Sequence, residues 1–516
     1  ESSAFYRCKN IETLFVSNLG HIGNSAFAGC TNLKSLIISN QGHVYSNAFS
    51  NCSNLKTAII SNNGNIDSQA FYKCVGLEQV DISNQGYIGT QAFYECTNLK
   101  IANINNSYAK YTPGVPLKLD GLSVYNSSKS QSYSFRSEEG GVLSFSWSVC
   151  DGTLRVYLDS TCILSKSDAK DNYVSINGSY NNVLYPGEHT LEVEMSGSNG
   201  RISVSDFMID YSDGMNVGAV RGEAFYGCSA LQTIRLGEEI GALADKVFYQ
   251  CYSLQEIIIP DSIKSVGKCC FGSCSALKSA MIGDGLAAIK DYTFQDCSAL
   301  ESVIIGNHVT SIDSFAFVNC SSLVEIELGD NTSVINNNAF ENCTSLSTIS
   351  IPHMVSNIED NAFKGCASLA DVIIENRSTK LKLGSNGSSP LFADCPLDSV
   401  YIGGKITYNT SQKSGYSPFY RNTSLRTITI TDQEDQIYEN EFYGCTNLKN
   451  VTIGHGIKNI GNRAFSGCSS LDKFLFGSNV RSIGEETFSD CTKMTELTSY
   501  SVLPPVCGAN ALDDIN

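Results

Sequence analysis

Cysteine and histidine are the side chains of this sequence best suited to chemistry, because thiolates and imidazoles bind metals and act as nucleophiles or bases. The chain has 21 cysteines and 6 histidines, and 16 of the cysteines recur at one position of a repeat with a period of 22 or 23 residues. No Cys-x-x-Cys pair or nearby histidine cluster accompanies them, although a zinc site needs its ligands in such clusters. We therefore expect neither a metal site nor a cofactor.

The remaining polar residues do not form the pattern of a catalytic site. The sequence contains no His-Glu-x-x-His pair, no Gly-x-Ser-x-Gly elbow and no phosphate-binding glycine loop. Acidic residues are scattered over the repeats as on a solvated face, not paired as in acid–base catalysis. His21 and His43 are 22 residues apart and should stack on neighbouring repeats, but Asn65 and Tyr87 continue the same row, which favours a solvated turn over a metal pair. The chain is therefore predicted not to be an enzyme.

The elements that position these residues follow from the repeat. A unit of the form Ala-Phe-x-x-Cys-x-x-Leu, with substitutions, occurs 17 times between Phe5 and Cys491. The alternation that follows it, as in Ile257-x-Ile259, predicts a short strand with one buried face. Gly, Asp, Asn or Pro then turns the chain, and a short helical or 3-10 turn carries the next Ala-Phe pair. Because one unit cannot bury a core alone, the units should stack into a solenoid whose parallel strands lie about 4.8 Å apart.

One complete unit carries a resemblance to a known family. Residues 460–471 read Ile-Gly-x-x-Ala-Phe-x-x-Cys-x-x-Leu, a pattern similar to the BspA-like leucine-rich repeats. The resemblance covers most of the chain and implies a leucine-rich-repeat solenoid that is extracellular, on the surface of a bacterium. The better-known family members are adhesins, which implies that a host or microbial surface protein is the partner. It implies no binding residues, because the shared motif is core.

The recurrent cysteines are predicted to form a ladder of buried free thiols. Equivalent positions of a solenoid point the same way about 4.8 Å apart, whereas a disulfide needs converging Cβ atoms about 3.8 Å apart. Asn422 in one of these slots also fits a stacked position better than a bonded one. Outside the ladder, Cys150 and Cys162 flank a predicted hairpin, and a disulfide between them is left open. The ladder comprises Cys30, Cys52, Cys74, Cys96, Cys228, Cys251, Cys274, Cys297, Cys320, Cys343, Cys366, Cys445, Cys468 and Cys491.

The repeat is interrupted over residues 106–213 by a different pattern. Apolar residues from Leu143 to Val149 alternate with serines, and Asp151-Gly152 is a hairpin signal, so this insert is predicted to be an antiparallel β-sandwich. The approach to a strand at residues 186–191 is similar to jelly-roll modules, including carbohydrate-binding ones. Trp147 falls on the apolar face of its strand and is expected in a core, not on a glycan platform.

Charge and composition restrict the partners. A net charge of −17 and a pI near 4.8 argue against nucleic acid and anionic membranes, and no apolar run is long enough for membrane insertion. We expect an adhesin-like, non-catalytic protein-binding scaffold; the alternatives are a glycan-binding surface protein that uses the insert, or a structural surface protein. Any targeting signal is expected outside this chain. The expected domains are the N-terminal solenoid (1–105), the insert (106–213), the C-terminal solenoid (214–498) and a C-terminal cap or tail (499–516).

The strand alternation also predicts a binding surface. Residues five and seven after the cysteine should face the open side of the sheet, and the seventh position is apolar in three successive units. Contiguous exposed apolar surface usually marks an interaction site. The alternatives are that isoleucine simply suits a strand, or that the insert covers this face. The candidate ligand-binding residues are Ile258, Met281, Ile304, Ile373 and Tyr401.

Overall fold

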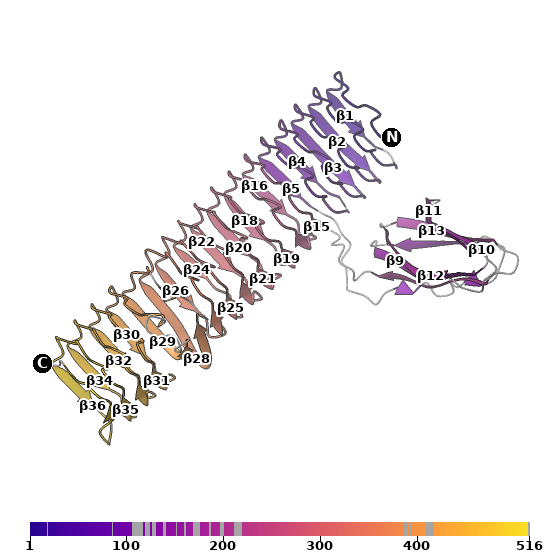
Figure 1. Cartoon of the computed structure of the whole chain (residues 1–516). Coiled ribbons are helices and arrows are strands. Elements are labelled where there is room, and N and C mark those ends of the chain that lie inside the picture. Colours follow the sequence, from indigo (N-terminus) through magenta and orange to yellow (C-terminus); the bar gives the residue numbers. More distant parts are fainter. Residues whose placement is uncertain are drawn as a thin grey trace.

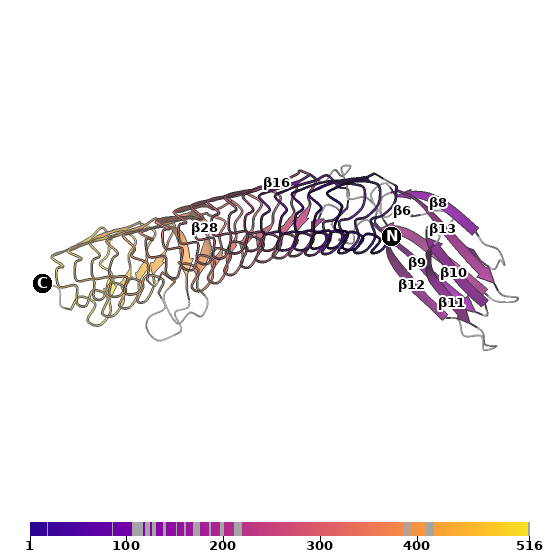
Figure 2. The ribbon, with the colours of Figure 1, turned by 90° about the horizontal axis from the view of Figure 1, so that it is seen from above.

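The computed structural model describes residues 1–105 apart from 18 and 85, and residues 219–513 apart from 385–390, 393 and 409–416; between 106 and 218 it describes only the backbone of strands. The described solenoid residues form a stack of coils that runs from the N-terminus to the C-terminus (Figure 1). Seen from above, the stack is gently bent (Figure 2). Among the described residues no helix is long and apolar enough to cross a membrane.

Each coil contributes one strand to a row of parallel strands, whose outward surface we call the strand face. Partners are 22 or 23 residues apart in most pairs, as the repeat predicts, and inward and outward residues alternate along each strand. The row consists of β1 (Thr13–Val16), β2 (Ser35–Asn40), β3 (Thr57–Asn62), β4 (Gln79–Ile82), β5 (Ile101–Ile104), β16 (Thr233–Leu236), β18 (Glu256–Ile259), β20 (Ser279–Ile282), β22 (Ser302–Ile305), β24 (Glu325–Glu327), β26 (Thr348–Ile351), β28 (Asp371–Leu383), β29 (Ser399–Thr407), β30 (Thr427–Ile430), β32 (Asn450–Ile453), β34 (Lys473–Phe476) and β36 (Glu496–Ser499).

A second row of two-residue parallel strands closes the coils. Single bridges replace it in the N-terminal coils, as between Ile22 and Val44. The long β28 pairs with a strand of each row, β26 and β27, and so joins them (Figure 1). The second row consists of β15 (Ala219–Val220), β17 (Ala242–Leu243), β19 (Ser265–Val266), β21 (Ala288–Ile289), β23 (Ser311–Ile312), β25 (Val334–Ile335), β27 (Asn357–Ile358), β31 (Gln436–Ile437), β33 (Asn459–Ile460), β35 (Ser482–Ile483) and β37 (Val506–Cys507).

Columns of identical residues fill the core. The repeat phenylalanines stack ring on ring from Phe5 to Phe488, with neighbouring centroids about 5 Å apart, as for Phe49 and Phe71 (5.2 Å). The ladder cysteines are fully buried. Each Sγ–H donates to the carbonyl oxygen of the phenylalanine in the preceding coil, for example Cys320 to Phe294 (3.2 Å). The same oxygen also accepts the N–H of Cys297 in its own coil (3.3 Å), so the thiol adds a second, inter-coil hydrogen bond to this buried carbonyl.

The expected short helical or 3-10 turn at the Ala-Phe pair is wrong. The segment consists of turns in every described coil, and no helix is present in the described residues. Asn47 and Asn51, two residues before and after Phe49, both have φ near 58°, a left-handed conformation that ends a right-handed helix. The turn N–H groups bond across coils instead, as from Phe49 to the oxygen of Ala70 (2.8 Å).

The strands between residues 106 and 218 form two antiparallel sheets, of order β11-β10-β13-β8 and β12-β9-β14-β6, with β7 beside β14. None of the described strand pairings joins them to the solenoid. The side chains of Trp147, Cys150 and Cys162, and so their predicted roles, lie outside the described residues. The insert strands are β6 (Leu117–Lys118), β7 (Val124–Tyr125), β8 (Gln131–Ser137), β9 (Gly141–Cys150), β10 (Gly152–Leu158), β11 (Thr161–Asp168), β12 (Ile176–Leu184), β13 (Gly187–Ser196) and β14 (Arg201–Asp210).

The solenoid is continuous across the insert. β5 and β16 pair directly, with Ile101 opposite Thr233, and the rings of Phe93 and Phe225 stack at 5.0 Å. At the other end, part of the expected tail extends the stack, because β37 pairs with β35 and Phe488 donates its N–H to the oxygen of Ala511 (3.1 Å).

Candidate binding surface on the strand face

Three successive coils place apolar side chains on the strand face. Ile258 of β18 lies opposite Met281 of β20, which lies opposite Ile304 of β22. Their neighbours along each strand point inward and are buried, so the three side chains must point outward. They are 60%, 48% and 48% exposed, respectively. We call these three residues the apolar stripe.

Polar residues border the stripe. The row two residues earlier in each strand holds Glu256, Ser279, Ser302 and Glu325 in register. At one end, Glu327 lies directly opposite Ile304 and stops the apolar row. The stripe is therefore a bounded apolar surface, not one segment of a uniformly apolar sheet.

The other two predicted contact residues lie elsewhere on the strand face. Ile373 of β28 is opposite Tyr401 of β29, so they form a pair of their own. Glu327 and Ser350 occupy the intervening positions of the row, and both are exposed. The Tyr401 hydroxyl donates to Oδ1 of Asn376 (3.1 Å). The five candidate residues thus fall into two groups, and only the apolar stripe spans three coils.

A further apolar group lies at the N-terminal end of the same row. Phe15, Ile37 and Ile59 are opposite one another on β1, β2 and β3 and are 65%, 37% and 43% exposed. The sequence signal for Phe15 is its place seven residues after Cys8. Our sequence-based candidate set omitted these residues, although their spacing is the same as in the stripe.

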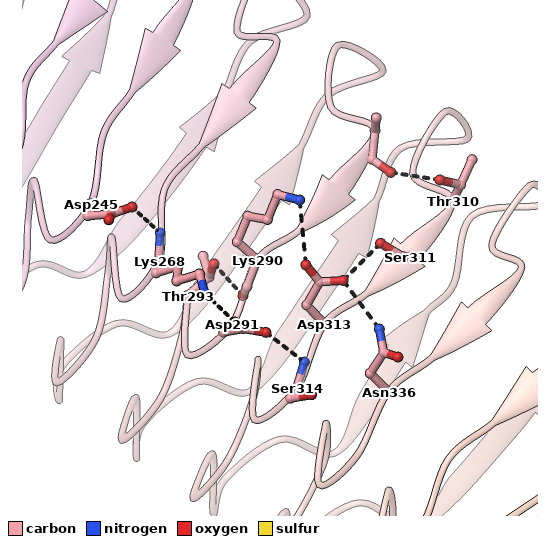
Figure 3. A network of polar contacts seen from close by, with 11 residues as sticks. Asp245, Lys268, Lys290, Asp291, Thr293, Thr310, Ser311, Asp313, Ser314 and Asn336 are labelled. Atoms are coloured by element: carbon pink, nitrogen blue, oxygen red, sulfur yellow. Dashed lines mark hydrogen bonds and ion pairs between the residues drawn. The ribbon is translucent and has the colours of Figure 1, made fainter. Parts of the chain in front are cut away.

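An ordered polar network covers a side of the coils away from the strand face (Figure 3). Lys268 pairs with Asp291 (2.8 Å), and Lys290 pairs with Asp313 (3.6 Å), each across one coil boundary. Asp313 also accepts hydrogen bonds from Ser311 (3.0 Å) and from the Asn336 amide (3.3 Å). Donors and acceptors are matched here, so this network joins coils together.

The described residues offer no group of three or more His, Cys, Asp or Glu side chains that could hold a metal ion. Burial raises the pKa of Cys274 and of Cys445 to about 12, so these thiols stay protonated at neutral pH.

The histidine row is only partly as expected. His21 and His43 do lie next to one another on adjacent coils, with ring centroids 5.0 Å apart and planes tilted by 36°. The expected solvated position is wrong for His43, which is 6% exposed. The reason is a hydrogen-bond ladder. Nδ1 of His21 accepts the backbone N–H of His43 (2.9 Å), and Nδ1 of His43 accepts that of Asn65 (3.1 Å). Burial, followed by the nearby His21, lowers the pKa of His43 to about 4.

Comparisons with solved structures return other leucine-rich-repeat proteins. The chain is similar to one from Bacteroides ovatus, at 17% identity over 93% of this chain and 80% of that chain, with a TM-score of 0.43. A leucine-rich cell surface protein of Faecalibacterium prausnitzii is 26% identical over 55% and 83%, with a TM-score of 0.30. The pneumococcal vaccine antigen PcpA is 11% identical over 95% and 89%, with a TM-score of 0.29. A comparison with curated protein sequences gives no match.

The model of the BspA-type leucine-rich-repeat region matches residues 1–113, 209–306, 287–412 and 412–504. These segments include nearly the whole solenoid and leave out most of the insert. The matched segment 209–306 contains the three strands that carry the apolar stripe. The chain belongs to the BspA-type leucine-rich-repeat family.

Proposed function

We propose that this protein is a non-catalytic, adhesin-like scaffold on a bacterial surface that binds a host or microbial protein through the apolar stripe. The observation that carries the proposal is the exposure of Ile258, Met281 and Ile304 in three adjacent coils. Family membership supports the surface location and the binding role. The partner is expected to cover the stripe, because contiguous exposed apolar surface usually marks an interaction site.

The rest of the row argues against a simple strand preference. If this position needed isoleucine for strand formation alone, apolar residues would recur along the whole solenoid. Instead Asp81, Asn103, Glu327, Ser350 and Thr429 take the same outward place in other coils and still lie in paired strands. The apolar side chains are therefore local to particular coils, as a binding surface requires.

The first prediction is that Met281→Asp combined with Ile304→Lys abolishes binding of the partner. The two changes cancel in charge, and both side chains are exposed, so the melting temperature should stay within a few degrees. Binding should be measured by surface capture from a panel of purified extracellular-matrix proteins and mucin. The matched control is Ser350→Asp with Thr429→Lys, which places the same charges in the same row outside the stripe. Undiminished capture by the stripe variant would move the site elsewhere.

We further propose that residues 106–213 form a separate β-sandwich domain, in which the two antiparallel sheets pack face to face. The sequence at its boundaries supports this modular reading. Each of three preceding coils turns through Asn-x-Gly, at Asn40–Gly42, Asn62–Gly64 and Asn84–Gly86. Excising residues 107–216 would join Asn106 to Val217-Gly218 and return Phe93 and Phe225 to a spacing of 22 residues.

The second prediction is that this excised chain folds with an unchanged melting temperature for the solenoid. A glycine is necessary at the third position of this turn, which Gly218 would fill. A Cβ at Gly42 would lie 2.4 Å from the oxygen of Gly20, and one at Gly64 would lie 2.8 Å from the backbone of Gly42. Excision of residues 109–218 is the matched control, since it removes the same length but puts Tyr108 into the glycine slot. Calorimetry should show a lower transition for the control only. Equal losses in both chains would mean that the insert packs into the solenoid core. A glycan-array signal lost with the excision would favour a sugar-binding role for the insert.

A further inference from the structure

The apolar stripe lies among acidic side chains that form no ion pair with another described residue. Glu256, Glu301, Glu325 and Glu327 are exposed on the same coils or the next one. None of these four forms an ion pair within the part of the chain that the structure describes. Three basic residues are nearby: Arg235 is exposed one coil before Ile258, Lys278 is exposed, and Lys264 donates to the backbone oxygen of Asp261 (2.7 Å).

Some acidic residues in other regions are neutralised by a lysine of a neighbouring coil. Glu78 pairs with both Lys56 (2.8 Å) and Lys100 (3.0 Å) in the N-terminal coils. Asp291 pairs with Lys268 in the polar network on the side of the coils away from the strand face. Exposed acids without an ion pair among the described residues also occur elsewhere, such as Glu439 and Asp472, but around the stripe such acids flank an exposed apolar surface. The negative potential of the acids around the stripe is available to an incoming partner.

A second acidic row lies in the turns that follow the stripe strands. Oδ1 of Asp261 accepts the backbone N–H of Asp284 (2.8 Å), and Oδ1 of Asp284 accepts that of Asn307 (2.7 Å). Asn307 in turn accepts the N–H of Asp330 (3.1 Å). These bonds hold the side chains in one orientation while they remain exposed. Fixed carboxylates lose little freedom on binding, which favours a cationic ligand at this edge.

We propose that the occupant of the apolar stripe is a cationic amphipathic helix of a partner protein, with an apolar ridge between rows of Lys or Arg. This inference rests on the proposed function of the same surface. Successive coils lie about 4.8 Å apart, and helix residues three or four apart rise by about 4.5–6 Å. One helix lying along the solenoid axis can therefore set an apolar side chain against each stripe residue. The Lys or Arg residues beside the apolar ridge then face the unpaired glutamates on one side. On the other side they face the turn aspartates Asp261 and Asp284.

The test uses three synthetic peptides of about 18 residues, which is five helical turns. The first is a Leu/Lys amphipathic helix, the second replaces every Leu by Ser, and the third replaces every Lys by Glu. Binding to the full chain is measured by fluorescence anisotropy. The Leu/Lys peptide should bind at least about tenfold more tightly than either of the others, and salt of about 0.5 M should weaken it. Equal binding of the Leu/Lys and Ser/Lys peptides would overturn the inference.

Site-directed variants separate this surface from the general negative charge of the protein. The first variant carries Asp261→Asn, Asp284→Asn, Glu301→Gln and Glu325→Gln. The two asparagines keep the oxygens that accept the backbone N–H groups of the turns. This variant should bind the Leu/Lys peptide about tenfold more weakly. The matched control neutralises four exposed acids far along the stack and should change binding less than about twofold. An equal loss in both variants would reduce the effect to net charge and contradict the inference. The control substitutions are Glu439→Gln, Asp472→Asn, Glu485→Gln and Asp490→Asn.

The two levels of the proposal fail in different ways. If the Leu/Lys peptide does not bind, but Met281→Asp with Ile304→Lys still abolishes capture of a matrix protein or mucin, the scaffold function stands and the cationic helix is wrong. If that double variant captures the protein normally, the apolar stripe is not the site at all.

Discussion

Replacing Glu441 by glutamine should stabilise the folded chain by about 4 kcal/mol at pH 8 and by almost nothing at pH 4. Glu441 stands directly before Phe442, at the position that holds a buried alanine such as Ala464 in the next coil. Only 2% of Glu441 is exposed. Burial, with the nearby Glu434 also contributing, raises the pKa of Glu441 to about 8.

The direction of the pH dependence follows from that shift. In the unfolded chain the Glu441 carboxyl ionises near its ordinary value of 4.5, whereas in the folded chain it holds its proton to about pH 8. The contribution of protonated Glu441 to the free energy of unfolding is therefore fully present at low pH, and it is lost as the pH rises between these two values. The surrounding groups offset only part of the loss. The backbone N–H of Tyr438 donates to Oε2 of Glu441 (2.6 Å) and lowers its pKa, but less than burial raises it. Glu434 is itself buried with a raised pKa, and burial also raises the pKa of Tyr408.

Glutamine keeps an oxygen for the Tyr438 N–H and removes the ionisation. Urea unfolding followed by circular dichroism at pH 8 and pH 4 measures the difference between the variant and the parent chain. Glu439→Gln is the control, because Glu439 is two residues away and exposed, so its change should be within about 0.5 kcal/mol at either pH. A gain at pH 8 no larger than that of the control would mean that Glu441 is ionised in the folded protein.

The sequence was sufficient to predict the rows of the solenoid. A fixed period of 22 or 23 residues sets the pairing of neighbouring coils, and alternation along a strand has a period of two, so side-chain direction follows directly. Ile258, Met281 and Ile304 could be placed together on this basis alone, and the structure has them opposite one another. Ile373 and Tyr401, the other two candidate residues, lie opposite one another as a separate pair beyond Glu327 and Ser350, and their role in binding stays a prediction.

Contacts between coils were harder to foresee. The turn at the Ala-Phe pair has left-handed residues such as Gln69 and Lys73, whose types do not announce that conformation as glycine would. The turn is stable because its N–H groups bond to the next coil, and no local sequence pattern encodes a partner 21 residues away. The burial of His43 and Glu441 has the same origin. Both side chains lie against a neighbouring coil, so their exposure depends on the stack and not on their own unit.

The His43 row predicts a second large pH effect, in the opposite direction. Below pH 6.5 the unfolded chain binds a proton at His43, whereas burial and the nearby His21 hold the folded-state pKa near 4. The contribution of neutral His43 to the free energy of unfolding is thus fully present above pH 6.5, and it decreases as the pH drops towards 4. The loss attributable to His43 should be about 2 kcal/mol at pH 5 and about 3 kcal/mol at pH 4.

Protonation would also act on the hydrogen-bond ladder itself. Nδ1 of His43 must be unprotonated to accept the N–H of Asn65. A charged His43 would lie against His21 and Tyr45, with ring centroids 5.0 Å and 5.7 Å away. Asp67 is half-buried, and its pKa is raised by burial in spite of its bond from Tyr87, so it is a weak source of compensating charge. Acid should therefore loosen the N-terminal coils first.

His43→Asn tests this account, because the next coil already uses asparagine at the same place. Oδ1 of Asn65 accepts the N–H of Tyr87 (3.2 Å), so an amide can replace the imidazole in the ladder without a titrating group. His455→Asn is the matched control: Nδ1 of His455 also accepts the N–H of the next coil, from Ser478 (3.3 Å), but His455 is exposed. Hydrogen exchange of the N-terminal coils at pH 7 and pH 5 should show that His43→Asn removes most of the acid-induced opening and that His455→Asn leaves it unchanged. If both variants open at pH 5 as the parent does, protonation of His43 is not what destabilises these coils.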